Sequence, residues 1–295
     1  MIDSMDLWVW CVVVVDLAIA IAAIAMLRWT AGRLFGFDTT EQLAAKNNFA
    51  FGFSLAGGVT AIALILAGAG AGEASHSLSA EALSVLLYAV VGIALLKIGL
   101  IINDLVTFNN FSMRDEIGSQ NVAASIVQAA NLIALGLLIH AAIDWVDGVG
   151  WQALVSVCVV FFLAQLVLLG VTRYRAFVYS RRHPEGNWQS AVQAGNVALA
   201  TRYAGQLIGS ALASSSAGGM VTYISGVIVD IYLSWILFAI VLAIALAGFS
   251  VIARTVVLAK VNVVEEVDRQ QNLGVAAIEA SIFIGVGLVM NAVIG

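Results

Sequence analysis

Residues 272–294 read NLGVAAIEASIFIGVGLVMNAVI, and residues 121–143 read NVAASIVQAANLIALGLLIHAAI. A shift of 151 positions superimposes the two stretches, with Asn121 on Asn272 and several glycine, alanine and leucine residues matched after them. Each stretch is long and apolar enough to cross a membrane as a helix. The chain therefore contains two copies of one membrane-spanning segment.

A second match extends the repeat toward the N-terminus. Residues 48–57 (NFAFGFSLAG) align with residues 196–205 (NVALATRYAG) at a shift of 148 positions. A shift that grows by a few residues across connecting loops is what a tandem duplication leaves. We therefore predict two homologous halves, residues 1–147 and residues 148–295.

The composition is that of a membrane protein. Apolar residues make up 62% of the chain and charged residues 11%, and the mean hydropathy is +1.01. In soluble domains roughly 45–50% of the residues are apolar and about 25% are charged. The apolar runs lack the strict alternation of transmembrane strands. We predict an all-α integral membrane protein with eight transmembrane helices, arranged as two tandem four-helix repeats inserted in the same orientation. The predicted spans are residues 7–27, 47–70, 81–102, 120–143, 151–172, 189–212, 224–250 and 271–294.

Among the predicted loops, lysine and arginine residues are confined to every second loop. The first, third, fifth and seventh loops contain them, whereas the two termini and the even-numbered loops contain none. Because positively charged loops stay in the cytoplasm, we predict that both termini are extracytoplasmic. Four spans return the chain to its starting side, so we also expect a two-fold axis along the membrane normal to relate the halves.

Several functional classes have no support in the sequence. The net charge is −5 and no basic patch with interleaved aromatic residues occurs, which argues against a nucleic-acid partner. No sequence typical of a phosphate-binding loop, a zinc hydrolase, a dithiol redox site or a serine nucleophile is present. Cys11 and Cys158 lie in apolar runs and have neither disulfide-framework nor metal-ligand spacing. We expect no enzymatic activity, no cofactor and no metal.

Polar residues inside the apolar runs are the candidate functional residues, because an ionised side chain at the bilayer centre costs roughly 2.5–3.5 kcal/mol. Arg202 lies about thirteen residues into the sixth span and Glu279 about eight residues into the eighth. At ~1.5 Å per residue the two opposite charges reach overlapping depths once tilt and side-chain length are allowed for. Their counterparts in the first half are Ser54 and Gln128, a neutral polar pair.

Two interpretations of this polar site remain open. Asp16 in the first span and Asp230 in the seventh add two further ionisable residues. In the functional interpretation, Arg202 and Glu279 line a site for an ion or proton, with Asp16 as a third member. In the structural interpretation, Arg202 and Glu279 form an internal salt bridge that fixes helix packing, since buried charges are usually paired.

The positions of four asparagines resemble a known family. The second helix of each half opens with Asn48-Phe-Ala-Phe or Asn196-Val-Ala-Leu, and an acidic residue shortly precedes the asparagine of each fourth helix, as in Glu116 before Asn121. Together these features are similar to the YjfL-like family of bacterial inner-membrane proteins, a domain of unknown function often found duplicated. The resemblance covers nearly the whole chain. It implies the fold and the inner-membrane location, and it brings no active site.

We therefore expect a polytopic inner-membrane protein that acts as a membrane scaffold or assembly subunit linked to envelope homeostasis. Small residues four positions apart allow close helix contact, and little of the chain lies outside the predicted spans. The alternative is a channel or permease for a small ion or solute that uses Arg202 and Glu279. The expected partners are the lipid bilayer and either further copies of the chain or another membrane protein.

Overall fold

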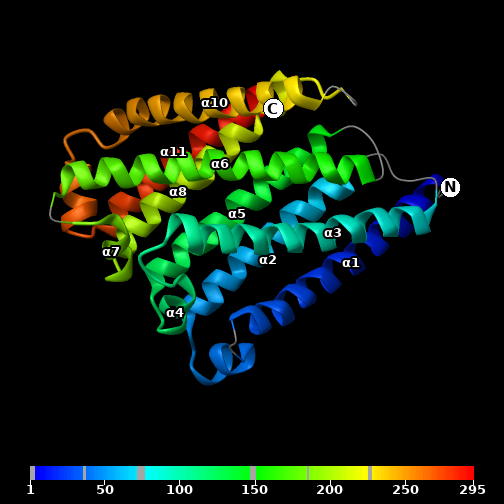
Figure 1. The fold of residues 1–295 in the computed structure, drawn as a ribbon, viewed down its shortest axis with the longest axis horizontal. Coiled ribbons are helices and arrows are strands. Elements are labelled where there is room, and N and C mark those ends of the chain that lie inside the picture. Colours follow the sequence, from blue (N-terminus) through cyan, green and yellow to red (C-terminus); the bar gives the residue numbers. More distant parts are fainter. Residues whose placement is uncertain (1–3, 36–37, 72–76, 147–150, 185, 225–227) are drawn as a thin grey trace.

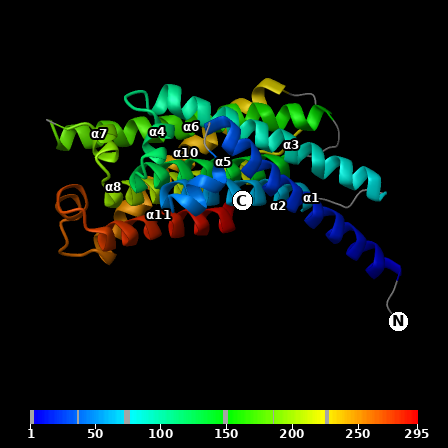
Figure 2. The ribbon, with the colours of Figure 1, turned by 90° about the horizontal axis from the view of Figure 1, so that it is seen from below.

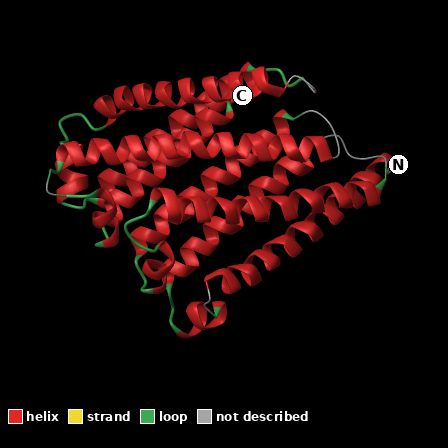
Figure 3. Cartoon of the chain, in the orientation of Figure 1, coloured by secondary structure: helices red, strands yellow, loops and turns green. Residues whose placement is uncertain are grey.

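The computed structural model describes residues 4–35, 38–71, 77–146, 151–184, 186–224 and 228–295. Within these ranges the chain forms helices joined by short loops, with no strand (Figure 3). The long helices are α1 (Ser4–Phe35), α2 (Phe49–Gly70), α3 (Leu78–Ile102), α5 (Val122–Trp145), α6 (Trp151–Arg182), α8 (Val197–Ser215), α10 (Ile228–Val257) and α11 (Leu273–Ile294). The short helices are η1 (Glu41–Ala45), η2 (Asn103–Thr107), α4 (Met113–Gly118), α7 (Trp188–Gln193), α9 (Ala217–Met220) and η3 (Glu265–Arg269), where η marks a π-helix. The predicted boundary between positions 147 and 148 lies outside the described residues.

Seven of the described helices are long and apolar enough to cross a membrane, namely α1, α2, α3, α5, α6, α10 and α11. The sixth predicted span, residues 189–212, is instead divided between α7 and α8. Arg202, Gln206 and three serines make α8 more polar than the membrane-spanning stretches of these seven helices. Length and composition therefore establish seven candidate spans and leave the membrane crossing of α8 as a prediction.

The four helices α2, α5, α8 and α11 begin with the same local structure. An asparagine precedes each helix, and its side-chain oxygen accepts a hydrogen bond from the backbone amide three residues later. The residue before each asparagine has a positive φ, which turns the chain sharply between a short helix and a long one. The capping asparagines are Asn48, Asn121, Asn196 and Asn272, and the residues before them are Asn47, Gln120, Gly195 and Gln271. The described part of the chain thus forms four helical hairpins of one design: α1–α2, α3–α5, α6–α8 and α10–α11.

The four hairpins lie side by side in one row (Figure 1). Helices α2, α5, α8 and α11 contact one another in that order and form an inner layer, while α1, α3, α6 and α10 form an outer layer in the same order. Figure 2 shows α3 and α6 on one side of the molecule and α2, α8 and α11 on the other.

This arrangement corrects one expectation about the two halves. A two-fold axis would carry the α5–α8 contact onto an equally close α11–α2 contact, yet α2 and α11 lie at opposite ends of the row (Figure 1). The expected two-fold relation is therefore wrong. The reason is that the structural repeat is a single hairpin, and successive hairpins add in the same direction.

Small residues set the spacing of the inner layer. A Cβ added to Gly57 would lie 2.6 Å from Ala129 Cα, and one added to Gly205 would lie 2.2 Å from Ala280 Cα. Both glycines stand nine residues after their capping asparagine, and both alanines stand eight residues after theirs. The same close backbone contact is therefore made in each half, as in other small-residue contacts between membrane helices.

A second crossing repeats in the same way further along the helices. A Cβ added to Gly136 would lie 2.7 Å from Ala61 Cα, and one added to Gly287 would lie 2.7 Å from the Gly209 carbonyl oxygen. Positions eight, nine, thirteen and fifteen after the capping asparagine hold small residues in all four inner helices: Ala56, Gly57, Ala61 and Ala63; Ala129, Ala130, Ala134 and Gly136; Ala204, Gly205, Gly209 and Ala211; Ala280, Ser281, Gly285 and Gly287.

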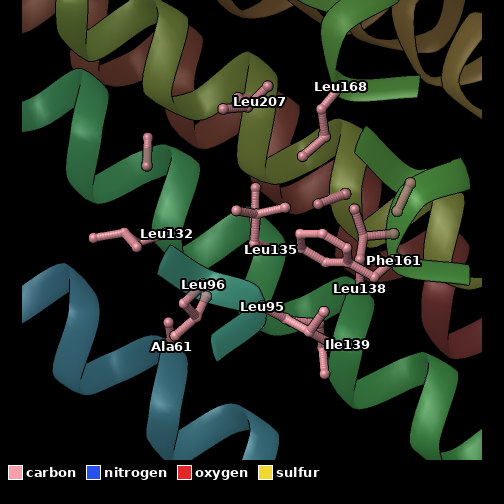
Figure 4. Close-up of a cluster of buried hydrophobic side chains, with 14 of the residues drawn as sticks. Ala61, Leu95, Leu96, Leu132, Leu135, Leu138, Ile139, Phe161, Leu168 and Leu207 are labelled. Atoms are coloured by element: carbon pink, nitrogen blue, oxygen red, sulfur yellow. The ribbon is translucent and has the colours of Figure 1, made fainter. Parts of the chain in front are cut away.

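The apolar core continues across the junction between the halves. In Figure 4, Leu135 and Leu138 of α5 lie close to Phe161 of α6, with Leu168 of α6 and Leu207 of α8 beyond them. Each of these side chains is almost fully buried. The two halves therefore share one core.

Candidate functional site

Arg202 and Glu279 lie close together, with 3.9 Å between Arg202 Nε and Glu279 Oε2. Neither is the nearest partner of the other. Arg202 Nη2 donates a hydrogen bond to Asp268 Oδ1, and Arg254 Nη1 donates one to Glu279 Oε1 at 3.0 Å. The side chains of Asp268 and Glu279 are 0% and 1% exposed. The result is a row of alternating charges, Asp268–Arg202–Glu279–Arg254, which is buried at its first three members and half-buried at Arg254, and which we call the charged cluster.

Each member of the charged cluster comes from a different element. Arg202 and Glu279 lie in the second turns of α8 and α11, six and seven residues after the capping asparagines. Asp268 lies in the π-helix η3, and Arg254 lies in the last turn of α10. The cluster therefore sits at the end of the molecule where the inner helices begin. It ties α10 and η3 to α8 and α11.

The charged cluster borders a cavity of about 40 Å³, which is room for a few water molecules. Arg175 and Arg182 of α6 line this cavity together with Arg202, Arg254 and Glu279. Within the described part of the chain, Arg175 Nε and Glu279 Oε2 are buried without a hydrogen-bond partner. The cavity is therefore polar, with unsatisfied groups of both signs at its wall.

The first half has an equivalent cavity of different character. Ser54 and Gln128, the counterparts of Arg202 and Glu279, line a cavity of about 40 Å³ whose other walls include Leu96, Lys97 and Leu132. Gln128 Oε1 is buried and has no hydrogen-bond partner among the described residues. The duplication thus produced two matched cavities, one mainly apolar and one charged.

Asp16 and Asp230 do not join the charged cluster. A Cβ on Gly70, the last residue of α2, would lie 3.7 Å from Asp16 Oδ2, so Asp16 lies at the opposite end of the inner layer. The seventh span was predicted to begin at residue 224, but α10 begins at Ile228. Asp230 therefore lies in the first turn of α10, where it is exposed. A carboxylate there suits the helix N-terminus. The six candidate residues therefore occupy four separate places.

Asp268 and Arg254 were not among the sequence candidates, although one signal points to Asp268. Ser112 caps α4 and Asn262 caps the helical turn before η3 by the same side-chain contact. This match places Gly118 of the first half on Asp268. Arg202, Glu279 and Asp268, three of the four members of the cluster, are therefore charged where their counterparts Ser54, Gln128 and Gly118 are neutral.

The sequence profile of a family described as Domain of Unknown Function (DUF350) matches residues 5–143, 77–175 and 150–294. The chain belongs to the DUF350 family. Two of these matches in the DUF350 protein cover the first four and the last four long helices, so the internal repeat is a repeat of this domain. The third match begins at the second hairpin, as expected when one hairpin is the repeating unit. Comparison with curated proteins and with solved structures found no match. The DUF350 protein is thus a polytopic integral membrane protein, and its family carries no assigned activity.

Proposed function

We propose that this DUF350 protein is a scaffold or assembly subunit of the bacterial inner membrane that associates head to tail with further copies of itself. The open row of hairpins supports this most directly. The contact between successive inner helices is made three times within the chain, as α2–α5, α5–α8 and α8–α11. A role in envelope homeostasis rests on the family resemblance alone.

At the first end of the row, α2 exposes the residues that other inner helices bury. Ala56 and Ala63 of α2 are exposed. They correspond to Ala129 and Gly136 of α5, which pack closely against α2. The outward face of α2 therefore carries the small residues of an inner-layer contact that has no partner among the residues that the structure describes.

At the other end of the row, α11 exposes the complementary face. Ser281 is exposed, and a Cβ added to Gly285 meets no atom within 4 Å. These residues correspond to Gly205 and Gly209 of α8, which pack closely against α11. A second copy whose α2 packs on α11 would repeat the internal contact. Such a head-to-tail contact gives a ring if the rotation closes and an open chain if it does not.

The head-to-tail contact predicts one disulfide cross-link between copies. Cys11 and Cys158 are first replaced by alanine; one tagged chain then carries Ala56→Cys and a second carries Ser281→Cys. We expect a mixed dimer on oxidation in native membranes, because these positions would face each other as Ala129 and Gly57 do. Gel analysis with the two tags measures the mixed species.

The matched control is Ile252→Cys on α10, a residue that is 62% exposed and lies near the same end of the molecule. Paired with Ala56→Cys, it should give little mixed dimer. Equal cross-linking of both pairs would mean random collision. No α2–α11 product, together with a monomeric mass in nanodiscs, would contradict self-association.

The proposal includes eight spans with both termini outside the cytoplasm. Helix α8 contacts α5, α6, α10 and α11, so its polar side chains face protein, where intramembrane polar residues are tolerated. With α8 as a span, the chain crosses the membrane an even number of times. The arginines and lysines of the odd-numbered loops set its orientation.

Labelling of introduced cysteines tests this topology. In intact cells, a membrane-impermeant maleimide should label Gly295→Cys and should label Arg181→Cys only after permeabilisation. Both variants are made in the chain that lacks Cys11 and Cys158. Labelling of Gly295→Cys only after permeabilisation would contradict either the proposed eighth span or the proposed orientation.

A channel or permease for a small ion or solute is the second candidate. The observation that favours it is the charged cavity, where Glu279 Oε2 and Arg175 Nε lack hydrogen-bond partners among the described residues. Against it, Arg202 and Glu279 each have a nearer partner of opposite charge. Flux measurements in proteoliposomes distinguish the two candidates, since a scaffold alone carries none.

A further inference from the structure

An apolar groove of about 520 Å³ lies between α6 and α10 in the outer layer, with α8 at its base. Its walls include Leu166, Gly170 and Val171 of α6 and Ile240, Ala243 and Ile244 of α10. Leu166 and Ile244 are also 58% and 67% exposed, so the groove opens on the lipid-facing side. This volume lies within the range of about 300–1,000 Å³ that is typical of ligand-binding pockets.

The groove leads to the polar cavity through one residue. Arg175 lines both the apolar groove and the cavity beside the charged cluster. Its guanidinium carbon lies 5.0 Å from the centre of the Phe283 ring, and its Nε has no hydrogen-bond partner within the described chain. Arg175 therefore stands at the junction of an apolar space and a charged one.

The charges around the cavity are unbalanced. Four guanidinium groups line it, against the single carboxylate of Glu279, and Asp268 adds one more behind Arg202. The two carboxylates are taken up by Arg202 and Arg254. Arg175 and Arg182 have no carboxylate within salt-bridge distance among the described residues. An anionic group would therefore be favoured at this position.

We propose that the groove and the cavity together bind an acidic glycerophospholipid, with an acyl chain between α6 and α10 and the phosphate against Arg175. This inference goes beyond the scaffold proposal and does not depend on it. Arg182 is the last residue of α6 and Arg175 lies seven residues earlier, about 10 Å deeper along the helix. A long arginine side chain at that depth reaches back toward the headgroup layer, which is where a lipid phosphate lies.

The equivalent positions in the first half differ from this site and supply the controls. A shift of 147 positions aligns Cys11 of α1 with Cys158 of α6, and at this shift Gly170 corresponds to Ala23, which is 5% exposed and packs in the core. A Cβ added to Gly170 meets no atom within 4 Å. Arg175 corresponds to Arg28, which is exposed and contacts Thr40. These two described positions of the first half therefore do not reproduce the open groove and the arginine without a hydrogen-bond partner at Nε.

The test is lipid retention by the full-length protein in nanodiscs and in detergent, measured by native mass spectrometry. Wild type should retain one phosphatidylglycerol in preference to phosphatidylcholine. Arg175→Gln should reduce that preference about fivefold, since one arginine near the headgroups contributes about 1 kcal/mol. Gly170→Leu and, independently, Ala243→Leu should reduce retention of both lipids by filling the groove. Arg28→Gln and Gly248→Leu should change neither, because both lie outside the site.

Inorganic phosphate alone distinguishes a lipid from a free anion. Phosphate at millimolar concentration should not displace the bound phosphatidylglycerol, because it lacks the acyl chain. Displacement by phosphate with unchanged retention in Gly170→Leu would overturn the lipid assignment. Equal retention of both lipids by wild type, or an equal loss in Arg28→Gln, would overturn it as well. The elution profile and the unfolding temperature confirm that each variant is folded. If Gly170→Leu does not fold, Ala243→Leu alone tests the filling of the groove.

Discussion

Replacement of Gly205 by alanine should lower the free energy of unfolding by about 3 kcal/mol or more, at or above the upper end of the usual cost of overpacking. The added Cβ would lie 2.2 Å from Ala280 Cα, 2.4 Å from its Cβ and 2.7 Å from its carbonyl oxygen. Backbone atoms cannot rotate away, so α8 and α11 must separate. Thermal and denaturant unfolding in detergent, monitored by tryptophan fluorescence, measures the loss.

Two other glycines calibrate this effect. Gly248 lies on the exposed face of α10, and a Cβ there meets no atom within 4 Å. Gly248→Ala should therefore be neutral or stabilise the protein by up to about 1 kcal/mol, through helix propensity. Gly57→Ala, at the equivalent crossing in the first half with a closest approach of 2.6 Å, should be destabilising but less so than Gly205→Ala. Equal stabilities of the Gly205 and Gly248 variants would contradict a close α8–α11 contact.

The helices and the duplication were predictable because both depend on local sequence. Asn121 and Asn272 head matching apolar segments, and α5 and α11 begin one residue after them. The smaller repeat was not recognised. The hairpins share little beyond the capping asparagine and four small-residue positions, such as Gly57 and its equivalents. Small residues occur throughout a membrane protein, so their register becomes evident only when the backbone contacts are known.

The charged cluster was only partly predictable, for two physical reasons. Arg202 and Glu279 stood out because charge inside an apolar run is rare. Asp268 is one of several acidic residues just before the last span, a place that suits a helix N-terminus, but η3 is a π-helix, which changes the faces that successive side chains occupy. Arg254 read as a loop residue, because the seventh span was expected to end at residue 250; α10 continues to Val257 and brings the arginine to Glu279.

Asp268→Asn should lower the free energy of unfolding by about 3–5 kcal/mol, the usual cost of removing one partner of a buried ion pair. Arg202 is 8% exposed, and without Asp268 its remaining carboxylate, Glu279, is 3.9 Å away and shared with Arg254. The matched control is Glu265→Gln. Glu265 pairs with Arg269 on the surface, where both side chains are at least 40% exposed, so that change should cost at most about 1 kcal/mol.

The rescue experiment shows which carboxylate is the true partner of Arg202. Arg202→Ser made with Asp268→Asn should recover much of the lost stability, because it removes both charges and restores the serine found at the equivalent position, Ser54. Arg202→Gln made with Glu279→Gln should be less stable than that double variant, since it leaves the buried Asp268 and the half-buried Arg254 without their hydrogen-bond partners. Full recovery in the second double variant and none in the first, measured by unfolding temperature in the same detergent, would instead make Arg202 and Glu279 the principal pair.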